Sequence, residues 1–356
     1  MRPGRHRVCI ALSDGMHKLE DCICDALYHP RRSRLGVSPL ISVLRCLQQM
    51  NTEPNESQSD VWSEWLLHTR FGNDPEHEQL LRTAIDPIAD RVLHGARLSA
   101  GMTLIDIGTG DGLMAFRAID TIGPSLHVIL TDISAPLLRH AEALAIQRNV
   151  RSQCRFIECS ADALKDVDDA SIDAVTTRAV LAYVPDKMEA LREFRRVLKP
   201  GGRLSIGEPI LRDDAFEAAS LKQLVDAQPP GSEDRFFSLL SRWKGAQFPD
   251  TEERIASNPI TNFSERDLVR FALDVGFTDI HMEFHVNVLP STVHSWEVFL
   301  ASSPHPWAPS LSRILAERFS TEERELFETI FRPRVEARQF VTADRIAYLT
   351  ALKPLS

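Results

Sequence analysis

Cysteine is scarce in this chain and unevenly placed. Four of its six cysteines lie within the first 49 residues, and only Cys154 and Cys159 follow. Since this distribution does not form a disulfide framework, we expect a reducing compartment and a cytoplasmic protein. Cys22 and Cys24 lack the two-residue gap and the second pair of a zinc site, so we interpret them as ordinary thiols and expect no metal.

Long apolar runs are also absent. No stretch approaches the roughly 20 apolar residues of a membrane span, and the early "VCIAL" is too short for the core of a signal peptide. We therefore expect no membrane span. The composition, 43% apolar and 26% charged, is typical of a globular chain.

Positive charge is deficient over most of the chain. Residues 1–49 hold eight Lys and Arg against four Asp and Glu, whereas the remaining residues hold 33 against 46. Such an acidic body is a poor electrostatic match for a phosphate backbone, which disfavours nucleic acid as a partner.

The first 49 residues differ in composition from the rest. They are rich in arginine and are followed by Met50 and the polar stretch "NTEPNESQSD". Two explanations stay open: a loosely ordered, transit-like extension, or an upstream start with Met50 as the true first residue. In either case we expect residues 1–59 to be poorly ordered or dispensable.

Two amphipathic helices are expected between residues 60 and 98. In "DVWSEWLLHTRFG", Trp62, Trp65 and Leu66 share one helical face and Asp60 is a candidate N-cap. Strands and helices then alternate, which predicts an α/β fold with helices on both faces of a parallel sheet. The expected strands lie at 103–108, 127–132, 154–159, 172–177 and 203–209, and the expected helices at 112–119, 136–149 and 187–198.

Beyond Pro209 the pattern is less regular. Residues 213–259 predict a helical insertion, and 309–331 a further helical stretch. In "FSERDLVRFALDVGF", Ser264 and Asp267 are spaced as a capping box and Gly276 ends the helix. Two more strands are expected at 278–289 and 345–352.

The stretch "LIDIGTGDG" places glycines at 108, 110 and 112 directly after the first strand. Glycine tolerates positive φ and lets a backbone approach a nucleotide-like ligand. The dinucleotide fingerprint does not fit, because Leu113 stands where its last glycine is needed. The turn carries Asp106 and Asp111 with no Lys or Arg before Arg117, so it suits a cationic ligand better than a pyrophosphate.

Four motifs in order give the chain a resemblance to the class I S-adenosylmethionine-dependent methyltransferases over roughly residues 60–290. "LIDIGTGDG" is similar to the family's first motif, and "ILTDIS" ends the second strand with Asp132, where the family holds the ribose hydroxyls. "CSADAL" supplies Asp162, where the family holds the adenine amino group. "LKPGGRLSI" resembles the family's turn into the fifth strand.

The resemblance implies a doubly wound, Rossmann-like, seven-stranded sheet whose last strand is antiparallel. It implies lid helices at 60–98, a core at 99–290 with an insertion at 210–260, and C-terminal helices with the final strand at 291–356. Trp62 and Trp65 would then lie over the cofactor, or anchor their helix in the core. The segments 210–260 and 290–340 would lengthen the rim where the substrate enters.

S-adenosylmethionine is the implied cofactor, and its cationic sulfonium and amino group match the acidic turn. Ile133 is expected to pack on the adenine, and Arg178 either to meet the methionyl carboxylate or to cap a helix. The predicted cofactor-binding residues are Asp106, Gly108, Thr109, Gly110, Asp111, Gly112, Asp132, Ile133, Ala161, Asp162 and Arg178.

The expected acceptor is a small organic molecule, methylated by in-line displacement. After the fourth strand, "TTRAVLAY" lacks the Asp/Asn-Pro-Pro-aromatic stretch of enzymes that methylate nucleic-acid amino groups. The chain then resembles the branch that includes the ubiquinone- and menaquinone-pathway C-methyltransferases, as a monomer or homodimer. Methylation of a protein side chain and a non-catalytic scaffold or regulatory role stay open as alternatives.

Five residues are weak candidates for a general base. Histidine titrates in the useful range, and His281 and His285 lie four apart on an expected strand, hence on one face opposite its apolar residues. The other candidates are His294, Glu208 and Tyr183.

Overall fold

The computed structural model describes residues 59–229 and 234–355, which belong to one compact unit that begins at Ser59. The expectations for residues 1–58, including the thiols of Cys22 and Cys24, lie outside the described residues. Within the described part, none of the helices is both long and apolar enough to cross a membrane.

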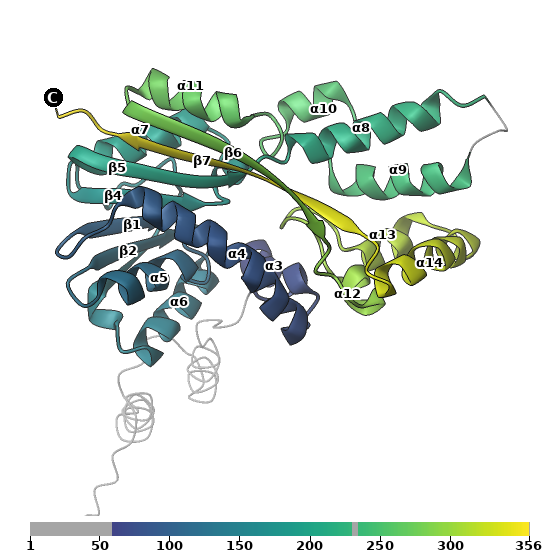
Figure 1. Ribbon diagram of the computed structural model, residues 1–356, viewed down its shortest axis with the longest axis horizontal. Helices are drawn as coiled ribbons and strands as arrows, with labels where there is room; N and C mark the ends of the chain where they lie inside the picture. Colours follow the sequence, from purple (N-terminus) through teal and green to yellow (C-terminus); the bar gives the residue numbers. More distant parts are fainter. Residues whose placement is uncertain (1–58, 230–233, 356) are drawn as a thin grey trace, which may run out of the picture. The chain divides into compact units, whose positions relative to one another are not determined.

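A seven-stranded sheet forms the centre of this unit (Figure 1). Its strand order is β3-β2-β1-β4-β5-β7-β6, parallel from β3 to β5, with β7 antiparallel to both of its neighbours. The predicted α/β fold with an antiparallel last strand is therefore confirmed. The strands are β1 Thr103–Ile107, β2 His127–Asp132, β3 Cys154–Glu158, β4 Ile172–Arg178, β5 Leu198–Pro209, β6 Thr278–Pro290 and β7 Val341–Leu352.

Helices cover both faces of the sheet, as the alternating pattern predicts. One face packs against α4 (Pro75–Ala96), α5 (Leu113–Ile122) and α6 (Ala135–Gln147). The other face packs against α7 (Lys187–Val197) and α11 (Glu265–Val275).

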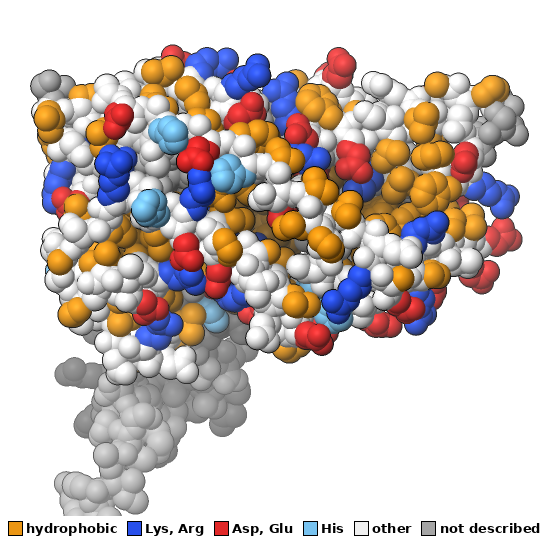
Figure 2. Space-filling view, in the orientation of Figure 1, with side chains coloured by type: hydrophobic (Ala, Val, Ile, Leu, Met, Phe, Trp, Pro, Cys, Tyr) orange, Lys and Arg blue, Asp and Glu red, His pale blue; other side chains and the backbone are white. Residues whose placement is uncertain are grey.

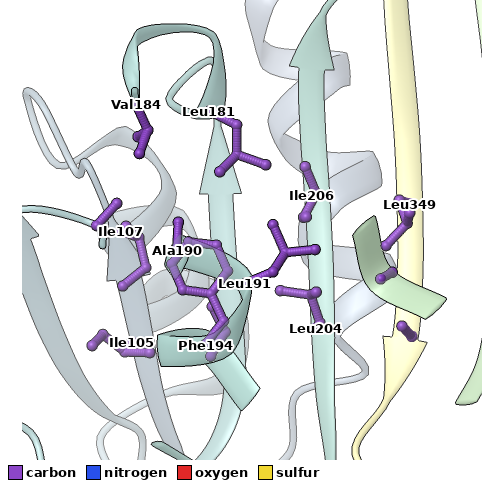
Figure 3. Close-up of a cluster of buried hydrophobic side chains, with 14 of the residues drawn as sticks. Ile105, Ile107, Leu181, Val184, Ala190, Leu191, Phe194, Leu204, Ile206 and Leu349 are labelled. Atoms are coloured by element: carbon purple, nitrogen blue, oxygen red, sulfur yellow. The ribbon is translucent and has the colours of Figure 1, made fainter. Parts of the chain in front are cut away.

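Successive side chains of a strand point to opposite faces of the sheet, so neighbouring residues belong to different cores. In β1, Leu104 belongs to the cluster beneath α5 and α6, whereas Ile105 and Ile107 belong to the cluster beneath α7. Figure 3 shows this second cluster, in which the ring of Phe194 lies beside Ile105 and Leu191 lies next to Leu204 and Ile206 of β5. Phe194 is completely buried.

Helix boundaries follow local capping chemistry. Asp60 and Ser63 form a capping box at the start of α3 (Val61–Leu67), which ends in a 3₁₀ turn at Thr69–Phe71. The predicted capping box of α11 is present at Ser264 and Asp267, and Gly276 ends the helix with φ 91°. The predictions at these two helices are confirmed.

A second group of helices lies beyond the sheet, beside the far ends of β6 and β7 (Figure 1). Trp243, Trp296, Phe327 and Phe331 pack in one largely aromatic core that joins helices distant in sequence. The helical stretch predicted at 309–331 is two helices, because Ser320 starts a new one with its own capping box. The members are α8 Arg212–Asp226, α9 Arg235–Gln247, α10 Glu252–Ser257, α12 Trp296–Ala301, α13 Leu311–Arg318 and α14 Thr321–Glu336.

Replacing Phe194 by alanine tests the core beneath α7. We expect a loss of about 3–5 kcal/mol in the free energy of unfolding, because the substitution removes a buried ring and leaves a cavity. Urea denaturation followed by circular dichroism measures it. Phe284→Ala on β6, where the ring is 37% exposed, is the matched control and should cost much less; equal losses for the two variants would contradict this account of the core.

Candidate active site

A cavity of about 400 Å³ lies where the glycine turn and the carboxyl ends of β2 and β4 meet. Helix α3 contributes Trp62, Trp65 and Leu66 to its wall, and Pro306 and Trp307 come from the segment between α12 and α13. Ligands of open parallel sheets bind at this end of the strands, and a cavity of this size suits a small molecule.

A residue with a Cβ would be unfavourable at each of the three glycines of the turn. Gly108, Gly110 and Gly112 have φ of 61°, 57° and 81°, in the left-handed region. A Cβ on Gly108 would lie 2.5 Å from a methyl group of Val180, and one on Gly110 would lie 2.8 Å from Leu66. The turn is therefore shaped both by its dihedral angles and by the close approach of its neighbours.

Asp106 lies beneath this turn and is only 1% exposed. Its two oxygens accept hydrogen bonds from the hydroxyls of Thr109, at 2.7 Å, and Thr176, at 3.0 Å. Burial raises the pKa of Asp106 to about 6. It does not line the cavity. Its carboxylate is held by these two hydroxyls within the sheet, and its predicted role toward a cationic ligand stays a prediction.

The turn is also less acidic than its local sequence indicates. Asp111 lines the cavity, but its carboxylate accepts from Arg82 on α4 at 2.8 Å. The fold brings Arg70 and Arg178 to the same wall. The local sequence has no Lys or Arg before Arg117, but the fold places three arginines near the turn: Arg178, which was predicted to bind the cofactor, and Arg70 and Arg82, which were not.

Arg178 and Arg70 present donors to the cavity. The Nε of Arg178 is buried and has no hydrogen-bond partner among the described residues. Arg70 lies over the ring of Trp65 at 5.1 Å, and burial together with the charge of Arg178 lowers its pKa to about 10. Two neighbouring guanidinium groups of this kind can hold a carboxylate. Arg70 carries no motif in the sequence and was not predicted.

Asp132 and Ile133 lie side by side at the end of β2. The two Asp132 oxygens accept from the backbone amides of Gly110 and Ser134, each at 2.9 Å. The carboxylate is 7% exposed, and burial raises its pKa. Each oxygen can accept a second hydrogen bond. Ile133 lines the cavity and is 50% exposed, which leaves an apolar surface available to a ligand.

The loop after β3 contributes Cys159, Ser160 and Ala161 to the wall. Asp162 does not line the cavity; it accepts a short hydrogen bond from the Ser160 hydroxyl. Its predicted contact with the adenine stays a prediction. Burial raises the pKa of Cys159 to about 11, so this thiol is protonated and unreactive at neutral pH.

Among the base candidates, Tyr183 lines the cavity. Its ring makes edge-to-face contacts with Trp62, at 5.2 Å, and Trp307, at 5.4 Å, between centroids. Burial and the nearby Glu208 raise the pKa of Tyr183, which keeps the phenol protonated.

Glu208 is fully buried and does not face the cavity. It accepts from the backbone amides of Val180 and Leu181 at 2.7 and 2.8 Å, and more weakly from Ala182. Burial raises its pKa to about 7. Its position makes it a support for the loop after β4 rather than a base.

The histidine candidates lie elsewhere. His281 and His285 do share one face of β6, where both hydrogen-bond to Glu283, at 3.3 and 3.1 Å. His294 lies 3.8 Å from Glu76. None of the three lines the cavity. His281 and His285 are on β6, the edge strand four places from β1, and His294 follows that strand. The structure therefore gives their predicted role as bases no support at this cavity.

The two rim segments differ in what they contribute. Pro306 and Trp307 reach the cavity from the segment 290–340, whereas no described residue of 210–260 lines it. The Trp65 Nε1 donates to the Ser303 carbonyl at 3.1 Å and so ties α3 to the same segment. In the described ranges, no three His, Cys, Asp or Glu side chains gather as a metal site would require.

Part of the chain is similar to known proteins. Residues 98–248 match a family model described as a methyltransferase domain. The chain is 39% identical over 103 residues to the ubiquinone/menaquinone biosynthesis C-methyltransferase UbiE of Brucella anthropi, covering 29% of this chain and 39% of that protein. The protein of the same name from Hahella chejuensis is 37% identical over 109 residues, covering 31% and 43%. The chain thus spans about two fifths of the length of these curated relatives.

A solved structure, that of the YcgJ protein from Bacillus subtilis, aligns with a TM-score of 0.48 and 17% identity. The alignment covers 76% of this chain and 99% of that one.

The raised pKa of Asp106 predicts that the free energy of unfolding depends on pH, and that Asp106→Asn removes this dependence. The folded state binds this proton more tightly than the unfolded state, so the free energy of unfolding of the parent falls as pH rises from about 4 to about 6. The stability of the variant relative to the parent should therefore rise over that range, by up to about 3 kcal/mol. Urea unfolding between pH 4 and 7 measures it.

Asp168→Asn is the control for this titration, since it removes an exposed carboxylate. A difference between Asp106→Asn and the parent that stays flat or falls with rising pH would show that Asp106 is not held in this way.

Proposed function

We propose that this chain, which contains a domain of the S-adenosylmethionine-dependent methyltransferase family, transfers the methyl group of that cofactor to a small organic acceptor. The cofactor of this domain family supplies a methyl group already activated by its sulfonium. The protein then has to align the acceptor with that methyl group, and no covalent nucleophile is needed. The observation that carries the proposal is one cavity that joins a glycine cradle, a carboxylate and an arginine with an unpaired donor, the Nε of Arg178.

Different residues of the cavity suit the ribose, the adenine and the methionyl carboxylate of the cofactor. Asp132 has acceptor capacity left for the ribose hydroxyls, and the exposed surface of Ile133 suits the adenine. The unpartnered Arg178 Nε, with Arg70 beside it, suits the methionyl carboxylate. Gly108 and Gly110 present backbone without a side chain at the cavity wall.

The aromatic wall indicates the kind of acceptor. Trp62, Tyr183 and Trp307 contact one another edge to face and line the cavity. Such a wall favours a flat, largely apolar molecule. Together with the relatives named as quinone-pathway C-methyltransferases, it supports carbon methylation of a small aromatic ring as the reaction class.

The cavity wall contains no histidine among the described residues. With the phenol of Tyr183 held protonated, the acceptor must bring its own electron-rich carbon, as a phenolate ring does. The chain then contributes orientation and the exclusion of water, with α3 as the proposed lid.

A protein side chain is a less favoured acceptor. It would require a shallow, open rim, whereas α3 and the segment around Trp307 form part of the wall of this cavity and are joined by the Trp65–Ser303 hydrogen bond. A non-catalytic scaffold would bind the cofactor without turnover. Incubation with methyl-labelled cofactor and a panel of small phenols separates these cases, since only the enzyme produces labelled phenol.

Asp132→Ala should weaken binding of S-adenosylhomocysteine roughly 10- to 150-fold, because about 1.5–3 kcal/mol of charged hydrogen bonding is lost. Isothermal calorimetry measures the affinity. Glu158→Ala is the matched control: Glu158 is the register partner of Asp132 on β3 but is exposed and outside the cavity. Equal affinity for Asp132→Ala and the parent would overturn the cofactor's proposed position.

Arg178→Gln tests the methionyl end of the cofactor separately. S-adenosylhomocysteine should bind at least about tenfold more weakly, since a charge-assisted contact to its carboxylate is lost. Methylthioadenosine has no carboxylate, so its affinity should be unchanged. If both ligands lose affinity equally, Arg178 supports the cavity wall rather than the carboxylate.

A further inference from the structure

A second hollow, of about 420 Å³, lies away from the cofactor cavity. It is bounded by the last turns of α4, by the start of the regular part of β5 and by the paired parts of β6 and β7. Figure 2 shows histidine, basic and acidic side chains gathered on this face of the molecule. The charged and titratable residues that line the hollow are Arg91, His94, Arg97, Arg203, His281 and Glu283.

The single carboxylate of this hollow is already engaged. Glu283 forms an ion pair with Arg91 and accepts from the ring nitrogens of His281 and His285. Arg91 also lies over the ring of Tyr348, 5.0 Å from its centroid. The negative charge of Glu283 is therefore already paired within this network.

Arg97 and Arg203 have no such partner. Neither side chain makes a hydrogen bond or an ion pair within the described part of the chain. Partial burial, and after it the charge of Arg97, lower the pKa of Arg203, whereas the charge of Asp279 raises it. Two like charges in one hollow repel each other, so an anion placed between them would be stabilised. The excess of positive charge is local to this hollow, because residues 50–356 as a whole carry 46 acidic against 33 basic residues.

The wall that carries these arginines is firmly attached. The buried Ser205 hydroxyl donates to the Val92 carbonyl of α4 at 2.7 Å. A Cβ on Gly95 would lie 2.5 Å from the same hydroxyl oxygen, so the helix can approach β5 this closely only with glycine there. The hollow is therefore formed in advance of any ligand, which lowers the entropic cost of binding.

We propose that this hollow binds a small anion through a phosphate or carboxylate group, with Arg97 and Arg203 as its main contacts. Guanidinium groups match both oxyanions with paired hydrogen bonds. The hollow has the volume of a small-molecule site, and the acidic body around it disfavours a nucleic-acid backbone. This site is separate from the cofactor cavity and does not depend on the proposed methyl transfer.

Calorimetric titration of the full chain with inorganic phosphate, and separately with citrate, tests the site at constant ionic strength. The parent should bind at least one of them saturably, and the double variant Arg97→Gln/Arg203→Gln should bind it at least about tenfold more weakly. Preference for phosphate or for citrate distinguishes the two oxyanions. Arg313→Gln is the matched control, because Arg313 is an exposed arginine of α13 that pairs with Glu317.

Hydrogen exchange of the parent provides a second measurement that needs no variant. Addition of the bound anion should slow exchange in peptides that contain residues 91–97 and 203–206. The proposal is overturned if neither anion binds saturably, if the double variant binds as the parent does, if Arg313→Gln loses binding equally, or if the protection falls elsewhere.

Discussion

The hydrogen bond from the Gly110 amide to Asp132 is the contact on which the cavity depends. It joins the turn after β1 to the end of β2, while the second oxygen of Asp132 accepts from the amide of Ser134, the N-cap of α6. One carboxylate thus positions the glycine turn, a strand end and a helix start together.

Two further buried carboxylates, Asp106 and Glu208, hold neighbouring groups at the same edge of the sheet. Asp106 is satisfied by two threonine hydroxyls and Glu208 by backbone amides of the loop after β4. Each oxygen of these carboxylates has a hydrogen-bond donor, so the buried groups are satisfied. Loss of water around the carboxylates disfavours the charged form, and this raises the pKa of both. Of the three carboxylates Asp106, Asp132 and Glu208, Asp132 is the one that also lines the cavity.

Helix α4 links the two hollows of the molecule. Near its middle, Arg82 pairs with Asp111 of the glycine turn, and nearer its end Arg91 pairs with Glu283 of β6. The helix packs along β5, with Val92 close to Gly207 and bonded to Ser205. A single 22-residue element thus contacts the wall of both sites.

Much of the architecture could be predicted from local patterns. The alternation of apolar segments predicted five parallel strands with helices on both faces, and the capping residues Asp60, Ser264 and Gly276 marked helix ends correctly. Each of these signals depends on a few neighbouring residues, which is why they can be read without a structure. The glycine spacing likewise indicated a turn that can take positive φ, because glycine adopts that backbone without the steric cost of a Cβ.

The charge balance of the site could not be predicted in this way. The sequence around the turn has two aspartates and no nearby cation, yet the fold buries Asp106, pairs Asp111 with Arg82 and brings Arg70 and Arg178 to the wall. It also separates His281 and His285 from the cavity by placing β6 at the sheet's edge. The sequence by itself determined the strands, the turn and the cap residues, since these depend on short-range backbone preferences. Only the tertiary structure decided which charges meet, because Coulomb and hydrogen-bond interactions depend on distance in space.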